Sequence, residues 1–213
     1  MFREFVKDKD LVFDVGANRG DAARQLLSLG AEVICIEPQK HLADQLTLLN
    51  VTVHQAAVGA HAGFMDLYSS SDDRFASLRA DWLDGHRALW DWPSRTTTTV
   101  PVVTLDLLIS QHRLPEFIKI DTEGHEDDVI RGLSTPVPAL SFEYCGRHHP
   151  LYDAHGGARA LPLVHDLNPR YRYRFAEHST AWASDWLTID QATQQLQQSD
   201  WGDIYAREAD DLR

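Results

Sequence analysis

Residues 12–20 read Val12-Phe13-Asp14-Val15-Gly16-Ala17-Asn18-Arg19-Gly20. An apolar run leads here into a turn with two glycines, and a helical pattern follows it. Gly16 permits a tight turn with backbone close to a ligand, and Gly20 permits close packing of the next helix. The spacing differs from the G-x-G-x-x-G of dinucleotide loops, but Asn18 tolerates the positive φ of the missing middle glycine. The stretch predicts a cofactor loop, the alternative being a turn that only joins strand to helix.

Short apolar runs with polar or glycine residues on either side recur along the chain, as is typical of buried strands. These runs are Leu11–Val15, Val33–Ile36, Val51–Val53, Phe117–Ile120 and Ala139–Phe142. Helical patterns alternate with them, at Asp21–Leu29, Gln39–Leu49, Leu105–His112 and Glu123–Leu133. The alternation predicts an α/β fold with a doubly wound, mostly parallel sheet and helices on both faces. Ligands of such folds bind at the carboxyl ends of the strands.

Two segments interrupt the alternation, near residues 69–99 and 144–165, and both are predicted to be insertions that border a substrate site. The tryptophans of the first segment line that site or form the insertion's own core; they are Trp82, Trp90 and Trp92. Further along, Tyr171–Phe175 and Trp186–Ile189 are predicted to be strands that complete the sheet, with an antiparallel edge as an alternative.

Composition limits the class of protein. The chain has 213 residues, of which 43% are hydrophobic and 24% charged, so a single domain over residues 1–213 is expected. A net charge of −12 argues against nucleic acid as a partner. No apolar stretch reaches the roughly 18 residues of a membrane span, and residues 1–10 lack a signal sequence. With Cys35 and Cys145 far apart, a cytoplasmic protein is expected, and a homodimer stays an open alternative.

Glu37 closes the second predicted strand and follows Gly16 by about 20 residues, the offset at which an acidic side chain takes the hydroxyls of a ribose. A glutamate at the end of a strand is by itself more often solvated surface. Its distance from the glycine loop favours the binding role here.

Further carboxylates follow the later strands. Asp121 and Glu123 come after Phe117–Ile120, and Glu143 ends the next strand. Carboxylates beside a crevice act as general bases, orient a hydroxyl or hold a divalent cation. The simpler explanation for Glu123 is that it caps the helix that follows. A histidine-rich stretch comes next, with His148, His149 and His155.

Four strings, in this order, resemble the FkbM family of S-adenosylmethionine-dependent methyltransferases: residues 12–20, Ile36-Glu37-Pro38, Ile118-Lys119-Ile120-Asp121-Thr122-Glu123-Gly124-His125-Glu126 and Ser141-Phe142-Glu143. The resemblance covers roughly residues 10–145. It implies a class I methyltransferase fold, Rossmann-like, with a seven-stranded sheet whose last inserted strand is antiparallel. It also implies O-methylation of a hydroxyl on a sugar, a polyketide or another natural product, so the expected partner is a small-molecule or glycan acceptor.

Carried over to this chain, the resemblance implies a set of cofactor contacts: Asp14, Gly16, Ala17, Asn18, Gly20, Glu37, Pro38, Ala57 and Val58. We expect Asp121 nearest the reacting centre, with Glu143 and either His149 or its neighbour His148 orienting the acceptor. Mg²⁺ or another divalent cation on Asp121 and Glu143 is an open alternative.

Two other functions are weighed against this one. A nicotinamide-dependent oxidoreductase would share the loop and the ribose acid, but the third glycine and a Tyr-x-x-x-Lys pair are missing. A domain that binds S-adenosylmethionine without catalysis would not need the set of carboxylates at positions 121, 123 and 143.

Overall fold

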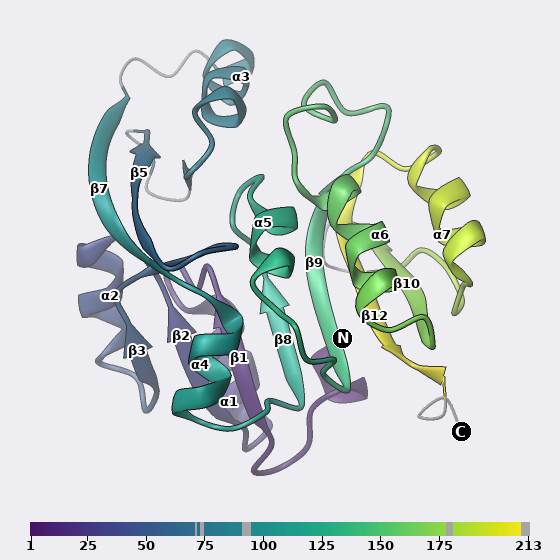
Figure 1. Cartoon of the computed structure of the whole chain (residues 1–213), viewed down its shortest axis with the longest axis horizontal. Helices are drawn as coiled ribbons and strands as arrows, with labels where there is room; N and C mark the ends of the chain where they lie inside the picture. Colours follow the sequence, from purple (N-terminus) through teal and green to yellow (C-terminus); the bar gives the residue numbers. More distant parts are fainter. Residues whose placement is uncertain (71, 73–74, 91–94, 178–180, 210–213) are drawn as a thin grey trace.

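The computed structural model describes residues 1–70, 72, 75–90, 95–177 and 181–209. Its centre is an eight-stranded sheet with strand order β11-β10-β12-β9-β8-β1-β2-β3 (Figure 1). The strands are β1 Leu11–Val15, β2 Glu32–Ile36, β3 Thr52–His54, β8 Phe117–Ile120, β9 Ala139–Cys145, β10 Tyr171–Glu177, β11 Ala181–Trp182 and β12 Trp201–Glu208. From β9 to β3 the strands are parallel, whereas β12 is antiparallel to both β9 and β10.

Seven strands were expected, and the short β11, paired with the end of β10, is the additional one. The last strand of the sequence, β12, is inserted between β9 and β10 and is antiparallel to both, a feature that the family resemblance implies; β11 is also antiparallel to its neighbour β10. The mixed sheet has helices on both faces, so the molecule is an α/β protein.

Strand alternation divides the core into two layers. Phe13 and Val15 pack with one set of helices and Val12 with the other, because successive side chains point to opposite faces. The first face is covered by α4 Leu105–Gln111, α5 Glu126–Arg131, α6 Gly157–Leu167 and α7 Ile189–Leu196 (Figure 1). The second face is covered by α1 Asp21–Ser28, by α2 Lys40–Leu46 through Leu46, and by the segment that includes the 3₁₀ helix Phe2–Glu4.

A second, four-stranded sheet stands beside the first, with strand order β4-β7-β5-β6. Its strands are β4 Ala57–Val58, β5 Gly63–Ser69, β6 Ala76–Ser77 and β7 Thr96–Val103. The helix α3 Ala80–Trp90 lies at the far end of β5 and β7 in Figure 1. Among the described residues, none forms a helix with the length and apolar character of a bilayer-spanning segment.

Two sequence-based expectations differ from the structure, and an open alternative about the tryptophans is settled for one of them. Helix α5 begins at Glu126 rather than at Glu123, because Glu123 (φ +56°) and Gly124 (φ +94°) are left-handed and cannot start a right-handed helix. Trp186–Ile189 is not a strand: Leu187 makes one isolated bridge, and Thr188 then caps α7. Trp82 is buried, and it packs against Phe75 of its own segment and also against His155 and Gly124. The side chain of Trp90 and all of Trp92 lie outside what the structure describes.

The chain order of the strands reverses between β1 and β8, where the sheet turns from β1-β2-β3 on one side to β8-β9 on the other. In open α/β sheets the ligand crevice lies at the carboxyl ends of the strands at such a reversal. The loops after β1, β2, β8 and β9 therefore meet at one edge.

Candidate active site

The loop after β1 is held in an unusual conformation. Gly16 (φ +75°), Asn18 (φ +48°) and Gly20 (φ +82°) all have left-handed φ values, which confirms that Asn18 stands where the backbone asks for a glycine-like residue. A Cβ on Gly16 would overlap the carbonyl oxygen of Asp121, so only glycine fits between this loop and the end of β8.

Gly16→Ala is therefore expected to destabilise the fold. The left-handed φ alone costs about 1–2 kcal/mol for a residue with a Cβ, and the overlap with Asp121 adds to that. The melting temperature, followed by circular dichroism, should fall by roughly 2–8 °C. Gly63→Ala is the matched control, because a Cβ there meets no atom within 4 Å. Equal melting temperatures for the two variants would contradict this account of the loop.

Glu37 joins the ends of two loops. One carboxylate oxygen accepts a hydrogen bond from the Asn18 backbone N–H (2.9 Å), and the other accepts one from the Gln39 N–H (2.8 Å). The side chain is buried, and burial raises its pKa, while the two backbone N–H groups act in the opposite direction. A carboxylate has about four acceptor positions, so two remain for a ligand.

Two adjoining cavities open at this edge of the sheet. The first, which we call the apolar cavity, has a volume of about 170 Å³. The predicted cofactor residues that line it are Gly16, Asn18, Glu37, Pro38, Ala57 and Val58. The second, the charged cavity, measures about 320 Å³ and includes Ala17, Lys119 and Asp203. Gly16, Asn18 and Asp121 border both cavities, so the two adjoin at these residues.

Two predicted cofactor residues lie outside the lining of both cavities. Asp14 is fully buried beneath the loop, where burial raises its pKa. Gly20 packs against α2 instead, since a Cβ there would come within 2.8 Å of Leu46. Both residues therefore support the loop by packing and line neither cavity.

Lys119 is a site residue that the sequence motifs did not single out. Its Nζ lies 3.1 Å from Asp121 Oδ2 and 3.5 Å from Asp14 Oδ1, and it donates a hydrogen bond to the carbonyl oxygen of Gly16 (3.3 Å). Burial lowers the lysine's pKa, but Asp121 and Asp14 outweigh it and hold that pKa above its ordinary value. The one available signal is a lysine in the otherwise apolar run of β8.

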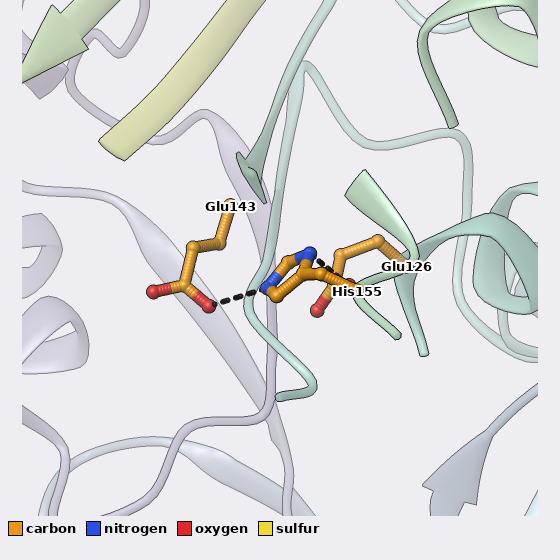
Figure 2. Close-up of side chains that lie close together, drawn as sticks. All are labelled: Glu126, Glu143 and His155. Carbon is orange, nitrogen blue, oxygen red and sulfur yellow. Dashed lines mark hydrogen bonds and ion pairs between the residues drawn. The ribbon is translucent and has the colours of Figure 1, made fainter. Parts of the chain in front are cut away.

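Glu143 and His155 come together at the end of β9 (Figure 2). His155 Nε2 lies 3.2 Å from Glu143 Oε2, and its Nδ1 lies 3.4 Å from Glu126 Oε2. Burial, followed by the carboxylate of Asp121, raises the pKa of Glu143 to about 7, although His155 acts in the opposite direction. The Glu143 side chain is 22% exposed and lines neither cavity, but it lies close enough to Asp121, which lines both, for that carboxylate to raise its pKa.

The loop between β8 and α5 adds a further acid. Burial and the carboxylates of Glu143 and Asp121 raise the pKa of Glu123 well above its ordinary value. Ser77 Oγ fixes the loop by donating to the Glu123 carbonyl oxygen (2.6 Å).

The histidine beside Glu143 is His155 and not the predicted His149. His149 lies in the turn after β9, where its Nδ1 accepts a hydrogen bond from the Leu151 N–H (3.2 Å). His155 follows that turn and is brought back to β9 just before α6. The sequence places both histidines in one stretch but does not indicate which of them returns to the sheet.

Comparison with known proteins gives a family. Residues 14–174 match the model of the methyltransferase FkbM domain. The hexuronic acid methyltransferase AglP of Haloferax volcanii is 25% identical over 141 residues, which cover 65% of this chain and 56% of that protein. The chain thus spans about half the length of this curated relative.

Solved structures give weaker matches. A TehB-like methyltransferase from Corynebacterium glutamicum has a TM-score of 0.46 at 8% identity, covering 97% of this chain and 84% of that one. A methyltransferase from Aquifex aeolicus has a TM-score of 0.45 at 13% identity, with coverages of 97% and 86%. Scores of this size do not establish a shared fold by themselves. The FkbM domain model, in contrast, spans most of the chain, and the chain belongs to the FkbM methyltransferase family.

Proposed function

We propose that this chain is an S-adenosylmethionine-dependent O-methyltransferase that acts on a hydroxyl group of a sugar or a related natural product. The observation that supports the proposal most strongly is the arrangement at one sheet edge: a left-handed glycine loop bridged by Glu37, beside a carboxylate that titrates near neutral pH. The first part suits a nucleoside cofactor and the second suits removal of a hydroxyl proton.

The chain offers separate surroundings for the two ends of the cofactor. Glu37 has free acceptor positions for ribose hydroxyls, and Ala57 and Val58 give an apolar wall for adenine. The charged cavity, with Lys119 and Asp203, suits the zwitterionic amino-acid end. The apolar cavity alone is smaller than the roughly 300–1,000 Å³ of typical ligand pockets, so the ligand would extend into both.

Glu143 is proposed as the general base. The bound cofactor supplies the methyl group and its own leaving group, so the acceptor oxygen bonds to the methyl carbon as the carbon–sulfur bond breaks, with the electron pair remaining on sulfur. Glu143 takes the acceptor's proton and, being partly exposed, returns it to solvent. Asp121, held by Lys119 beside Gly16, lies where the two cavities meet and is proposed to orient the acceptor hydroxyl.

The acceptor class follows from the chemistry of the site and from the relative. AglP is named for methylation of a hexuronic acid. A weakly acidic sugar hydroxyl needs a base near its oxygen, which Glu143 provides. We therefore propose a sugar hydroxyl, with hexuronic acids as the first candidates.

Methyl transfer is tested with radiolabelled S-adenosylmethionine and a panel of acceptors. The panel contains glucuronic and galacturonic acid, their oligosaccharides, neutral hexoses and simple phenols. Transfer to a sugar, identified by mass spectrometry as a methyl ether, is expected. Cofactor binding without transfer to any member would favour a non-catalytic binding domain, and exclusive transfer to phenols would exclude the sugar class.

Removal of divalent cations is expected to leave activity unchanged. The predicted ligands already have nitrogen partners: Lys119 lies 3.1 Å from Asp121 Oδ2, and His155 lies 3.2 Å from Glu143 Oε2. Lys119 supplies a positive charge beside Asp121, and His155 engages Glu143, so these residues attract a resident Mg²⁺ ion only weakly. Transfer to the best acceptor should be equal before and after dialysis against EDTA. A loss of more than about tenfold that added Mg²⁺ restores would overturn this reading.

A further inference from the structure

We infer that His155 is a positioning residue for Glu143: its ring holds one oxygen of that carboxylate and is itself held by Glu126, so that the other oxygen is directed to the acceptor (Figure 2). The inference rests on the proposed function, because it assigns the groups that prepare the base. His155 is almost completely buried between the two glutamates, so it has no contact with an acceptor of its own.

The hydrogen bonds of His155 fix which nitrogen carries the proton. The backbone N–H of Gly157 donates to Nδ1 (2.9 Å), so in the neutral ring Nδ1 has the lone pair and Nε2 has the hydrogen. The Nε2–H then donates to Glu143 Oε2. When the ring is charged, Nδ1 also carries a hydrogen, so it no longer accepts from Gly157 and faces Glu126 Oε2 instead, while Nε2 keeps its hydrogen. Glu143 Oε2 is thus an acceptor in both states, and Oε1 stays available to take a proton.

Glu126 fixes the far side of the ring. Its Oε1 accepts hydrogen bonds from the backbone N–H groups of Thr122 (2.9 Å) and Gly124 (3.2 Å) and from the Thr122 hydroxyl (3.1 Å). Among the described residues its Oε2 has no hydrogen-bond partner; it is fully buried and faces His155 Nδ1. A buried carboxylate oxygen in that place favours a positive ring.

The charge on the ring counters an excess of acid. Glu143 faces Asp121 and Glu123 from the β8–α5 loop and Glu126 from α5, and Asp203 of β12 pairs with it across the sheet. Burial lowers the pKa of His155, but Glu126 and Glu143 outweigh burial and raise it. A charged His155 in turn lowers the pKa of Glu143. The carboxylate of Glu143 therefore stays ionised at a lower pH than it would beside its acidic neighbours alone.

The same three side chains also resemble a metal site by composition, since Glu126, Glu143 and His155 offer donor atoms within 4.8 Å of one another. The one lone pair of the neutral ring, on Nδ1, is already used. Nδ1 accepts the Gly157 N–H, and Nε2 donates its hydrogen to Glu143. The geometry therefore favours a hydrogen-bonded triad over a cation site.

The first test is the pH profile of kcat/KM for methyl transfer to the best acceptor of the panel. In the wild type the acid limb should lie near pH 7, because the carboxylate of Glu143 is the active form. His155→Gln keeps a donor but removes the charge, so the limb should move to higher pH by roughly one unit. His155→Ala also removes the donor, and kcat should fall by roughly 10- to 100-fold with the KM for S-adenosylmethionine unchanged.

His61→Gln is the matched control, because His61 is exposed in the turn between β4 and β5. Its profile should equal that of the wild type. A purely structural role for His155 would lower kcat at every pH without moving the limb. An unmoved limb in His155→Gln, with normal affinity for S-adenosylhomocysteine, would overturn the inference while leaving the proposed function intact.

A second test needs neither variants nor an acceptor. In protein labelled with ¹⁵N-histidine, two-bond proton–nitrogen correlation NMR reports which ring nitrogen is protonated. The neutral form of His155 should be the Nε2–H tautomer, and Nδ1 should be the nitrogen that titrates. A neutral Nδ1–H form would exclude the triad. Failure of the wild type to bind S-adenosylhomocysteine would instead count against the proposed function.

Discussion

Glu143→Gln is expected to lower kcat by roughly 10²- to 10⁴-fold and to leave the affinity for S-adenosylhomocysteine unchanged. Glutamine keeps the size of the side chain and can still accept a hydrogen bond from His155, but it cannot take a proton. Burial and Asp121 raise the pKa of Glu143 to about 7. In the wild type, kcat/KM should therefore fall about tenfold for each pH unit below that value.

The measurement is the initial rate of methyl transfer from labelled S-adenosylmethionine, together with calorimetric titration of the variant. Glu32→Gln is the matched control: Glu32 is exposed at the start of β2, and its ion pair with Arg113 is a surface contact of small energy. A Glu143→Gln variant within threefold of the wild-type kcat would rule Glu143 out as the base. Asp121→Asn would then be the next variant to measure.

Glu37→Ala is expected to weaken binding of S-adenosylhomocysteine by 100-fold or more. Hydrogen bonds to a charged group contribute roughly 1.5–3 kcal/mol each, and a ribose presents two hydroxyls. The variant also loses the bridge between Asn18 and Gln39, so the loop itself becomes less well ordered. Both effects act in the same direction.

Isothermal titration calorimetry of Glu37→Ala and Glu37→Gln separates the two effects. Glutamine can keep one acceptor oxygen but not the charge, so its loss should be intermediate. Glu32→Ala, at the other end of the same strand, should bind as the wild type does. Wild-type affinity in Glu37→Ala would show that the ribose does not lie against this side chain.

The central strands were predictable because local sequence determines them. The apolar runs at β1 and β8 have the predicted bounds, since both faces of these strands are buried and a polar or glycine residue marks each end. The second sheet was not predicted, because much of β5 and β7 is exposed and their residues carry no continuous apolar signal. Helix α5 starts later than predicted because Glu123 and Gly124 adopt left-handed φ values in the loop before it. The apolar periodicity of the sequence carries no signal for that loop conformation.

The site likewise contains residues whose positions could be predicted from the sequence and others whose positions could not. The proposed roles of Gly16 and Glu37 depend on one loop and the next strand, so their spacing in the sequence was informative. Glu126 and His155 acquire theirs only when α5 and the segment before α6 pack beside β9. In the sequence, Glu126 is already accounted for as an acidic residue in the first turn of a helix, so no further role is indicated. Nothing in the local sequence distinguishes His155 from His149. Such contacts are set by tertiary packing, which periodicity does not encode.

The claim on which everything else depends is that the crevice beside Gly16 and Glu37 binds S-adenosylmethionine. It is tested most directly by calorimetric titration of the wild-type protein with S-adenosylhomocysteine and, in the same buffer, with NAD⁺ and NADPH. Binding of S-adenosylhomocysteine alone is the predicted result. A nicotinamide signal with no response to S-adenosylhomocysteine would contradict the account and would favour an oxidoreductase.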